Sequence, residues 1–387
     1  MSANKFCKDV IAVLRTIVKD EFVPLHAPSF EGNEWEYLKE CLDSTYVSSV
    51  GPYVDQFEAN LAGFTGSKYA IATVNGTAAL HVALKLIDLR MGDEVLIPSL
   101  SFVATANAVS YCNATPHFID SDKKTLGVDS EKLAQYLREN TDQKSGFCFN
   151  RHTNKRIKAI VPMHTFGHPV NLDPLVKLSR DFNIDIIEDA AESLGSYYKG
   201  RHTGTFGLVG TLSFNGNKII TTGGGGAILT DNREIALLAK HLTTTAKIKH
   251  EWEFIHDMVG YNYRMPNINA ALGCAQLEAI EEKLRKKRAL FDVYKLAFKD
   301  IEGLSIFSEP DDCKSNYWLQ TLVLDDNKIE MRNELLKATN EEKIQTRPIW
   351  RPLHLLKPFI GMPKMNLDST NLLSEKIINI PSSPNII

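Results

Sequence analysis

The sequence contains few of the features that mark secreted, membrane-spanning or nucleic-acid-binding proteins. Its six cysteines lie far apart with no paired spacing, which argues against zinc sites and disulfides and favours free thiols in a reducing compartment. No apolar run is long enough to cross a bilayer, and Val10 to Leu14 is too short for a signal peptide. The net charge of −3 gives no basic excess for nucleic acid. We therefore expect a cytoplasmic protein that binds no metal, nucleic acid or membrane.

The length and composition of the chain favour a large folded core. Its 387 residues, 43% of them hydrophobic, are enough for about two domains. From Phe22 to Tyr263, short strand-like runs alternate with helical segments. This alternation predicts an α/β fold with a mainly parallel sheet and crossover helices. The expected strands include 70–74, 94–97, 157–161 and 185–187.

The pattern changes towards both ends of the chain. Apolar residues from Phe6 to Val18 follow helical spacing, which predicts an amphipathic helix packed on the body of the protein or on a partner. Residues 270–298 predict one long helix, in which the basic cluster 283–288 forms a solvated face balanced by nearby glutamates. A strand is expected at 318–324, within a smaller α+β domain. The expected division is an N-terminal helix and arm at 1–30, a large domain at 31–265 and a small domain at 266–387.

One lysine, Lys218, lies in a polar turn between two apolar runs, and four consecutive glycines follow at 223–226. A glycine run beside a lysine is typical of backbone that passes close to a ligand. A phosphate-binding P-loop is excluded, because Asn217 and Ile219 flank the lysine where that motif needs Gly and Ser or Thr. The glycine spacing of a dinucleotide site is also missing. A Schiff-base lysine fits this turn, and so does a surface lysine before a flexible loop.

A second segment offers acids at the end of a strand. Residues 185–189 read as a buried strand that ends in Glu188 and Asp189. Ligands of open α/β sheets lie at the carboxyl ends of the strands. Pyridoxal phosphate (PLP) needs a carboxylate against its pyridinium nitrogen, so such an acid suits that cofactor when a lysine and a glycine-rich strand accompany it. The alternative is that both acids are solvated loop residues.

A third segment suits a phosphate group. Residues 72–80 pass from a strand to a helix through Asn75, Gly76 and Thr77, and Thr77 can cap the helix. The free N–H groups and the positive dipole end of such a helix bind phosphate readily. A plain helix cap would explain the same residues.

Six strings of the sequence follow the order that is typical of one family. They are 75–80 (NGTAAL), 98–107 (PSLSFVATAN), 162–169 (PMHTFGHP), 188–192 (EDAAE), 213–218 (SFNGNK) and 260–265 (GYNYRM). Together they resemble the DegT/DnrJ/EryC1/StrS family of PLP-dependent sugar aminotransferases. Residues 46–51, 242–246 and 380–384 are most similar to the legionaminic-acid branch of that family. The resemblance implies an aspartate-aminotransferase-like fold of type I, PLP as the cofactor and a homodimer with shared active sites.

The resemblance also implies a role for each matching residue. Lys218 would form the Schiff base with the cofactor and transfer protons, and Asp189 would pair with the pyridine nitrogen. Phe102 would stack on the ring, and Glu192, where many members have Gln, would lie near the ring hydroxyl. His164 would be a catalytic residue close to the ring, with a purely structural histidine as the alternative.

The remaining candidate residues would bind phosphate or substrate. Gly76, Thr77 and Ser213 would hold the phosphate of the cofactor, and Asn262 would reach it from a neighbouring subunit. In similar enzymes the segment 347–354 lies close to the nucleotide sugar, and a diphosphate needs cationic partners. Its candidate contacts are Arg347, Arg351 and His354. The alternative is a proline-rich surface turn with incidental arginines.

The reaction that the resemblance implies is transfer of an amino group from glutamate to C4 of a UDP-linked, N-acetylated 4-keto-6-deoxy sugar. Such a reaction serves bacterial surface-glycan biosynthesis, in legionaminic acid or di-amino sugar pathways. A 3-keto-sugar aminotransferase is a close alternative. A nucleotide-sugar dehydratase is another, although its branch typically replaces the lysine by histidine, so Lys218 argues against it. A regulator that only binds PLP is the last alternative, and no DNA-binding module supports it.

Overall fold

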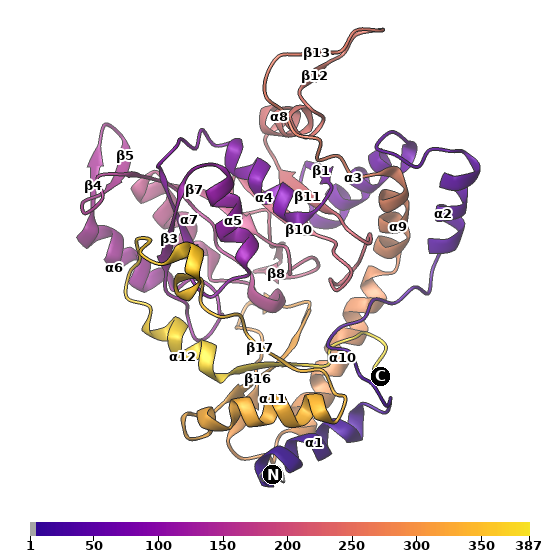
Figure 1. The fold of residues 1–387 in the computed structure, drawn as a ribbon, viewed down its shortest axis with the longest axis vertical. Coiled ribbons are helices and arrows are strands. Elements are labelled where there is room, and N and C mark those ends of the chain that lie inside the picture. Colours follow the sequence, from indigo (N-terminus) through magenta and orange to yellow (C-terminus); the bar gives the residue numbers. More distant parts are fainter. Residues whose placement is uncertain (1–4) are drawn as a thin grey trace.

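A nine-stranded sheet forms the centre of the larger part of the molecule (Figure 1). The computed structural model of the chain describes residues 5–387. The main path of the sheet runs β1-β11-β10-β7-β6-β2-β3, and β4 and β5 extend it beside β6. Its strands are β1 (Tyr69–Thr73), β2 (Glu94–Pro98), β3 (Thr115–Ile119), β4 (Thr141–Lys144), β5 (Phe147–Asn150), β6 (Arg156–Ile160), β7 (Asp185–Asp189), β10 (Val209–Ser213) and β11 (Gly226–Thr230).

The direction of these strands confirms the mainly parallel sheet that the sequence predicts. β10, β7, β6, β2 and β3 are parallel neighbours, whereas β11 runs antiparallel to both β1 and β10. The expected strands at 70–74, 94–97, 157–161 and 185–187 correspond to β1, β2, β6 and β7 within two residues at each end. The carboxyl ends of these parallel strands therefore lie at the same edge of the sheet.

Two hydrophobic cores cover the two faces of the sheet. Because successive side chains of a strand point to opposite faces, Ile71 and Ile228 join one core while Ala72 and Leu229 join the other. The first core takes helices α4 (Gly76–Lys85), α5 (Val103–Tyr111), α6 (Ser130–Asn140), α7 (Leu172–Phe182) and α8 (Arg233–Thr243). The second takes α2 (Glu34–Asp43), α3 (Pro52–Thr65) and α9 (Asn267–Glu278). The large domain is thus a sheet between two helical layers.

A smaller antiparallel sheet forms the second part of the molecule, at the bottom of Figure 1. Its strand order is β14-β16-β18-β17, with β14 (Leu304–Ile306), β16 (Gln320–Leu324), β17 (Arg347–Pro348) and β18 (Ile377–Ile380). Helices α1 (Lys5–Ile17), α10 (Ile280–Ala297) and α11 (Arg332–Glu341) share one core with this sheet. The remaining elements are α12 (Asp368–Lys376), the hairpin β12 (Lys247–Ile248) with β13 (Ile255–His256), and a small sheet of β8 (Tyr197–Tyr198), β9 (Arg201–His202) and β15 (Cys313–Lys314).

The single helix expected at 270–298 is wrong: α9 ends at Glu278, and α10 begins after Ala279, whose φ of −92° and ψ of 3° interrupt the helical geometry. α9 packs in the core of the large domain. α10 contributes Ile280 and Leu284 to that core and then Leu290 and Tyr294 to the core of the small domain. We therefore propose this break, rather than residue 266, as the domain boundary. The amphipathic pattern of the N-terminal segment belongs to α1, which packs inside the small domain; residues 1–4 lie outside the described residues.

The solvated face expected for the basic cluster 283–288 is also wrong for two of its five cations. Lys283 and Lys287 are one helical turn apart and both are buried. The Lys283 ammonium donates to Ser29, and that of Lys287 donates to the carbonyl oxygen of Trp318 at 2.7 Å. These lysines link α10 to loops beside the large domain. Within residues 5–387, no helix combines the length and apolar character needed to cross a membrane.

Candidate active site

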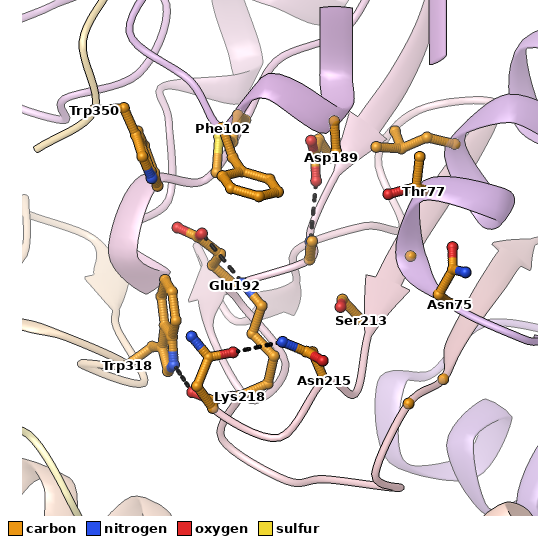
Figure 2. A pocket seen from close by; sticks show the side chains of 18 residues that line it. Asn75, Thr77, Phe102, Asp189, Glu192, Ser213, Asn215, Lys218, Trp318 and Trp350 are labelled. Atoms are coloured by element: carbon orange, nitrogen blue, oxygen red, sulfur yellow. Dashed lines mark hydrogen bonds and ion pairs between the residues drawn. The ribbon is translucent and has the colours of Figure 1, made fainter. Parts of the chain in front are cut away.

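A cavity of about 350 Å³ opens at the carboxyl ends of the central strands (Figure 2). Loops that follow β1, β2, β7 and β10 form most of its wall, and two tryptophans of the small domain complete it. The cavity brings together seven of the residues singled out by sequence: Gly76, Thr77, Phe102, Asp189, Glu192, Ser213 and Lys218. They come from four separate segments, so the fold, and not sequence proximity, assembles them.

Lys218 lies in the turn between β10 and β11, as its sequence context predicts. Its backbone N–H donates to the carbonyl oxygen of Asn215 at 2.9 Å, which closes the turn. Its side-chain Nζ lies 3.2 Å from Glu192 Oε1 and 3.8 Å from the centre of the Trp318 ring. The Trp318 indole N–H donates in turn to the carbonyl oxygen of Asn217. The surface-lysine alternative is therefore wrong, because the ammonium points into the cavity and is largely enclosed.

Asp189 is buried and borders the cavity from the end of β7. Its Oδ2 accepts a hydrogen bond from the Thr105 hydroxyl at 2.8 Å, and its Oδ1 accepts from the backbone N–H of Ala191 at 3.2 Å. Burial raises the pKa of this carboxyl, while the two hydrogen bonds and Lys218 oppose that rise. The alternative of a solvated loop acid is wrong for this residue.

Glu188, the preceding residue of β7, is buried away from the cavity lining. Burial alone would raise its pKa, but the bond with His164 and the backbone N–H groups of Gly204 and Gly207 lower it. Adjacent strand residues point to opposite sides, so Glu188 serves the packing of β7 while Asp189 faces the cavity.

His164 does not line the cavity, which corrects the catalytic position expected for it. Its ring is fully buried, and the backbone N–H of Val170 donates to Nδ1 at 3.2 Å. Nδ1 is therefore the acceptor, so Nε2 carries the proton and donates to Glu188 Oε2 at 3.1 Å. Both nitrogens of the His164 ring therefore have hydrogen-bond partners, and the ring holds β7 in place from outside the cavity.

The N-terminus of α4 forms the other end of the cavity. Asn75 caps this helix by accepting from the Ala78 N–H at 2.8 Å, so the cap expected at Thr77 is wrong. The N–H groups of Gly76 and Thr77 find no acceptor within residues 5–387 and remain available at the positive end of the helix. A Cβ on Gly76 would lie 2.8 Å from that of Ser213, so this position requires glycine.

Four expected residues lie outside the cavity of their own chain. Asn262 is bridged to Thr244, and its Oδ1 accepts from the Arg264 guanidinium at 3.3 Å. The Arg347 and Arg351 side chains are exposed and make no hydrogen bond or ion pair within residues 5–387, although the Arg347 backbone pairs with Asn379 of β18. His354 lies with Nδ1 2.8 Å from the Ser99 hydroxyl.

Four polar or aromatic residues of the lining were given no role from the sequence: Asn215, Asn217, Trp318 and Trp350. Trp350 lies between Arg347 and Arg351 in the segment expected to meet substrate, and contact of the two arginines with substrate stays a prediction. An aromatic flanked by polar residues near a site was the available signal. Trp318 was assigned only to a strand, and no local pattern distinguishes it from a core residue.

The arrangement fits a phosphorylated aromatic aldehyde. The free N–H groups of α4 suit a phosphate, the Phe102 ring offers a stacking face, and buried Asp189 suits a cationic ring nitrogen. Residues 28–387 match the DegT/DnrJ/EryC1/StrS aminotransferase family. The chain belongs to this family. It is an aminotransferase, and its cofactor is PLP.

Relatives of the chain include enzymes that are named for a nucleotide sugar. The chain is 37% identical to GDP-perosamine synthase of Escherichia coli O157:H7, over 95% of this chain and 94% of the relative. It is 34% identical to GDP-perosamine synthase of Vibrio cholerae, over 94% and 95% of the two chains. Among solved structures, DesI in the presence of its TDP-sugar product is 26% identical with a TM-score of 0.83, over 96% of this chain and 91% of DesI.

Proposed function

We propose that the protein transfers an amino group from glutamate to C4 of a nucleotide-linked 4-keto-6-deoxy sugar. The observation that carries the proposal is the position of the Lys218 amine, inside a cavity that also contains a buried acid, an aromatic face and the open N-terminus of a helix. These are the groups that a PLP-dependent transfer of nitrogen requires. Family members of similar length carry nucleotide sugars in their names, which supports the sugar as the acceptor.

Each lining residue has a distinct task in this reaction. When bound, PLP supplies an electrophilic carbonyl carbon and a ring that withdraws electrons from the carbon that loses its proton. Asp189 holds the ring nitrogen in its protonated state, and burial of this carboxylate strengthens the attraction. The Gly76 and Thr77 amides bind phosphate, Ser213 lies beside them, and Phe102 covers the ring. The Lys218 amine removes the proton from the donor carbon and later delivers a proton to the sugar.

Different observations support two different nucleotides on the sugar substrate. The names of the relatives support a GDP-linked sugar. The strings at 46–51, 242–246 and 380–384 support the UDP-linked, N-acetylated sugar of the legionaminic-acid branch. We place the GDP-linked sugar first, because those relatives align over more than nine tenths of the chain.

The substrate proposal is tested by offering both acceptors to one enzyme preparation. Enzyme first treated with glutamate is freed of the amino acid and then mixed with a GDP-linked or a UDP-linked, N-acetylated 4-keto-6-deoxy sugar. Mass spectrometry should find a product in which an amino group has replaced the keto oxygen in one of the two. A dehydratase would instead give a product that has lost water without gaining nitrogen. A regulator that only binds PLP would change neither sugar.

A further inference from the structure

The ammonium group of Lys218 is held by groups from two different domains. Glu192 Oε1, in the large domain, lies 3.2 Å from Nζ, and the ring of Trp318, in the small domain, covers it at 3.8 Å (Figure 2). The side chain of Glu192 is 2% exposed and that of Lys218 is 13% exposed. A proton shared by this pair has little direct access to solvent.

The carboxylate of Glu192 is fixed from its other side. Its Oε2 accepts the backbone N–H of Phe166 at 2.9 Å. Phe166 has a φ of 55°, a left-handed conformation that a bulky side chain rarely adopts. Its neighbour Gly167 has a φ of 94°, and a Cβ there would lie 1.8 Å from Asn316 Oδ1. This strained backbone directs the Phe166 N–H at Glu192 Oε2, so that Glu192 Oε1 faces Lys218.

The charges around the pair favour protonation of the Glu192 carboxylate once the Lys218 ammonium has lost its proton. Burial raises the pKa of this carboxyl, Lys218 and the Phe166 N–H oppose the rise, and Asp189 on β7 adds to it. On the side of the arm before α2, His26 faces Lys218, and burial with nearby lysines holds its pKa well below the ordinary range, so it is neutral. The remaining titratable groups here, His164 and Glu188, are paired with each other.

We propose that Lys218 and Glu192 share one proton and exchange it within the cavity, so that Glu192 accepts the proton that the ammonium must lose before its nitrogen can react. The proposal rests on the proposed function, in which that nitrogen bonds to the cofactor. The proton passes from Nζ to Oε1, and the freed lone pair attacks the aldehyde carbon. The two hydrogens left on nitrogen then depart with the carbonyl oxygen as water. Glu192 then returns the proton to this nitrogen, whose protonated form absorbs near ~420 nm, and is again a carboxylate.

The shared proton has a consequence for pH dependence. While the pair holds one proton, the fraction with a free amine and a neutral acid does not change with pH, because both arrangements contain the same number of protons. Cofactor capture by Lys218 should therefore gain nothing from rising pH in this range. In Glu192→Gln the ammonium must release its proton to water, so capture should rise about tenfold per pH unit until the amine is free. The amide oxygen can still accept the Phe166 N–H, so the fold is retained.

The test compares capture rates of full-length protein freed of cofactor. Protein is mixed with PLP between about pH 6 and about pH 9, and the band near ~420 nm is followed over time. PLP titrates equally in every sample, so the ratio of wild-type to variant rates is the readout. We expect this ratio to change about tenfold per pH unit for Glu192→Gln. It should stay constant for the control Glu58→Gln, which breaks a similar pair with Lys240 outside the cavity. A constant ratio for Glu192→Gln would overturn the proposal.

A second measurement does not depend on a variant that folds. The wild-type capture rate is instead divided by the rate at which a free lysine analogue captures PLP at the same pH. The analogue must lose its proton to water, so its rate rises about tenfold per pH unit below its pKa, and the ratio should fall about tenfold per pH unit if Glu192 takes the proton. A constant ratio would contradict the proposal. If wild-type protein forms no band at any pH, the proposed function itself fails, so the two failures are distinct.

Discussion

At the scale of the residue, Lys218 and Asp189 line the cavity, and contacts with Glu192 and Thr105 orient them. Lys218 and Asp189 could be found because an isolated lysine before a glycine run and an acid at a strand end are both visible locally. Thr105, which donates to Asp189, lies within the string 98–107, but nothing in that string marks it as the partner of an acid. Trp318, which covers Lys218, lies in a segment with no local signal. His164 was misplaced for a related reason, because a motif shows that a histidine is present and not which way its ring points.

Lys218→Arg should abolish transamination while the fold is retained. The guanidinium keeps the positive charge beside Glu192, but it stays protonated and cannot serve as an amine. Steady-state turnover with glutamate measures the effect, and Lys240→Arg, in the partly buried pair with Glu58 outside the cavity, is the matched control. Activity of the Lys218 variant within about tenfold of wild type would remove this residue from the mechanism, since the lost step has no substitute.

Asp189→Asn should lower turnover by at least ~10²-fold, the scale seen when a key electrostatic partner is lost. A neutral amide no longer favours a protonated ring nitrogen. Asp120→Asn is the control, because Asp120 is a buried carboxylate that pairs with Lys132 away from the cavity. Equal losses in both variants would show that general damage to the fold, and not the charge at the ring, explains the result.

At the scale of the element, the sequence predicts where strands lie, but not the contacts that interrupt a helix or bury its charged side chains. Short apolar runs between helical segments located β1, β2, β6 and β7. A strand that is buried on both faces is apolar along most of its length, which is visible locally. The break between α9 and α10 has no proline or glycine to mark it, because it follows from packing against two different cores. Lys283 and Lys287 were assigned to solvent because a local basic pattern cannot reveal the carbonyl groups that receive them.

The contact between β11 and the N-terminus of α4 gives a test at this scale. A Cβ on Gly226 would lie 2.6 Å from the carbonyl carbon of Asn75 and 2.7 Å from the Gly76 nitrogen. Gly226→Ala should therefore reduce the free energy of unfolding by about 1–3 kcal/mol, the usual cost of overpacking, and weaken PLP binding. Gly63→Ala, in α3, is the control, because its Cβ would meet nothing within 4 Å and the position lies outside the cavity lining. Denaturant midpoints and PLP titrations of the two variants should differ; matching values would mean that the contact does not position the phosphate site.

At the scale of the whole molecule, Asn262 and one exposed hairpin bear on the predicted dimer. Asn262 lies outside the cavity of its own chain, next to the segment that leads to the β12–β13 hairpin. This hairpin projects from the body in Figure 1, and its tip exposes Trp252 and Phe254 at 74% and 78%. Exposed apolar surface of this kind marks a contact with another chain. A dimer with shared sites remains a prediction that this surface supports.

Mixing two inactive variants tests the shared site. Lys218→Ala and Asn262→Ala protein, allowed to exchange subunits, should form mixed dimers in which one site carries both defects and the other carries neither. Random pairing should then restore about a quarter of wild-type activity, since about half of the dimers are mixed and each has one intact site. If exchange is confirmed and no activity returns, Asn262 acts within its own subunit.

The central claim is that Lys218 binds PLP and that the cavity passes an amino group from glutamate to a sugar. An absorbance record of one enzyme sample tests it most directly. We expect a band near ~420 nm that glutamate removes, with one 2-oxoglutarate formed per site, and that a nucleotide-linked 4-keto-6-deoxy sugar restores. A band that persists in glutamate, or one that glutamate removes and neither the GDP-linked nor the UDP-linked keto sugar restores, would contradict it.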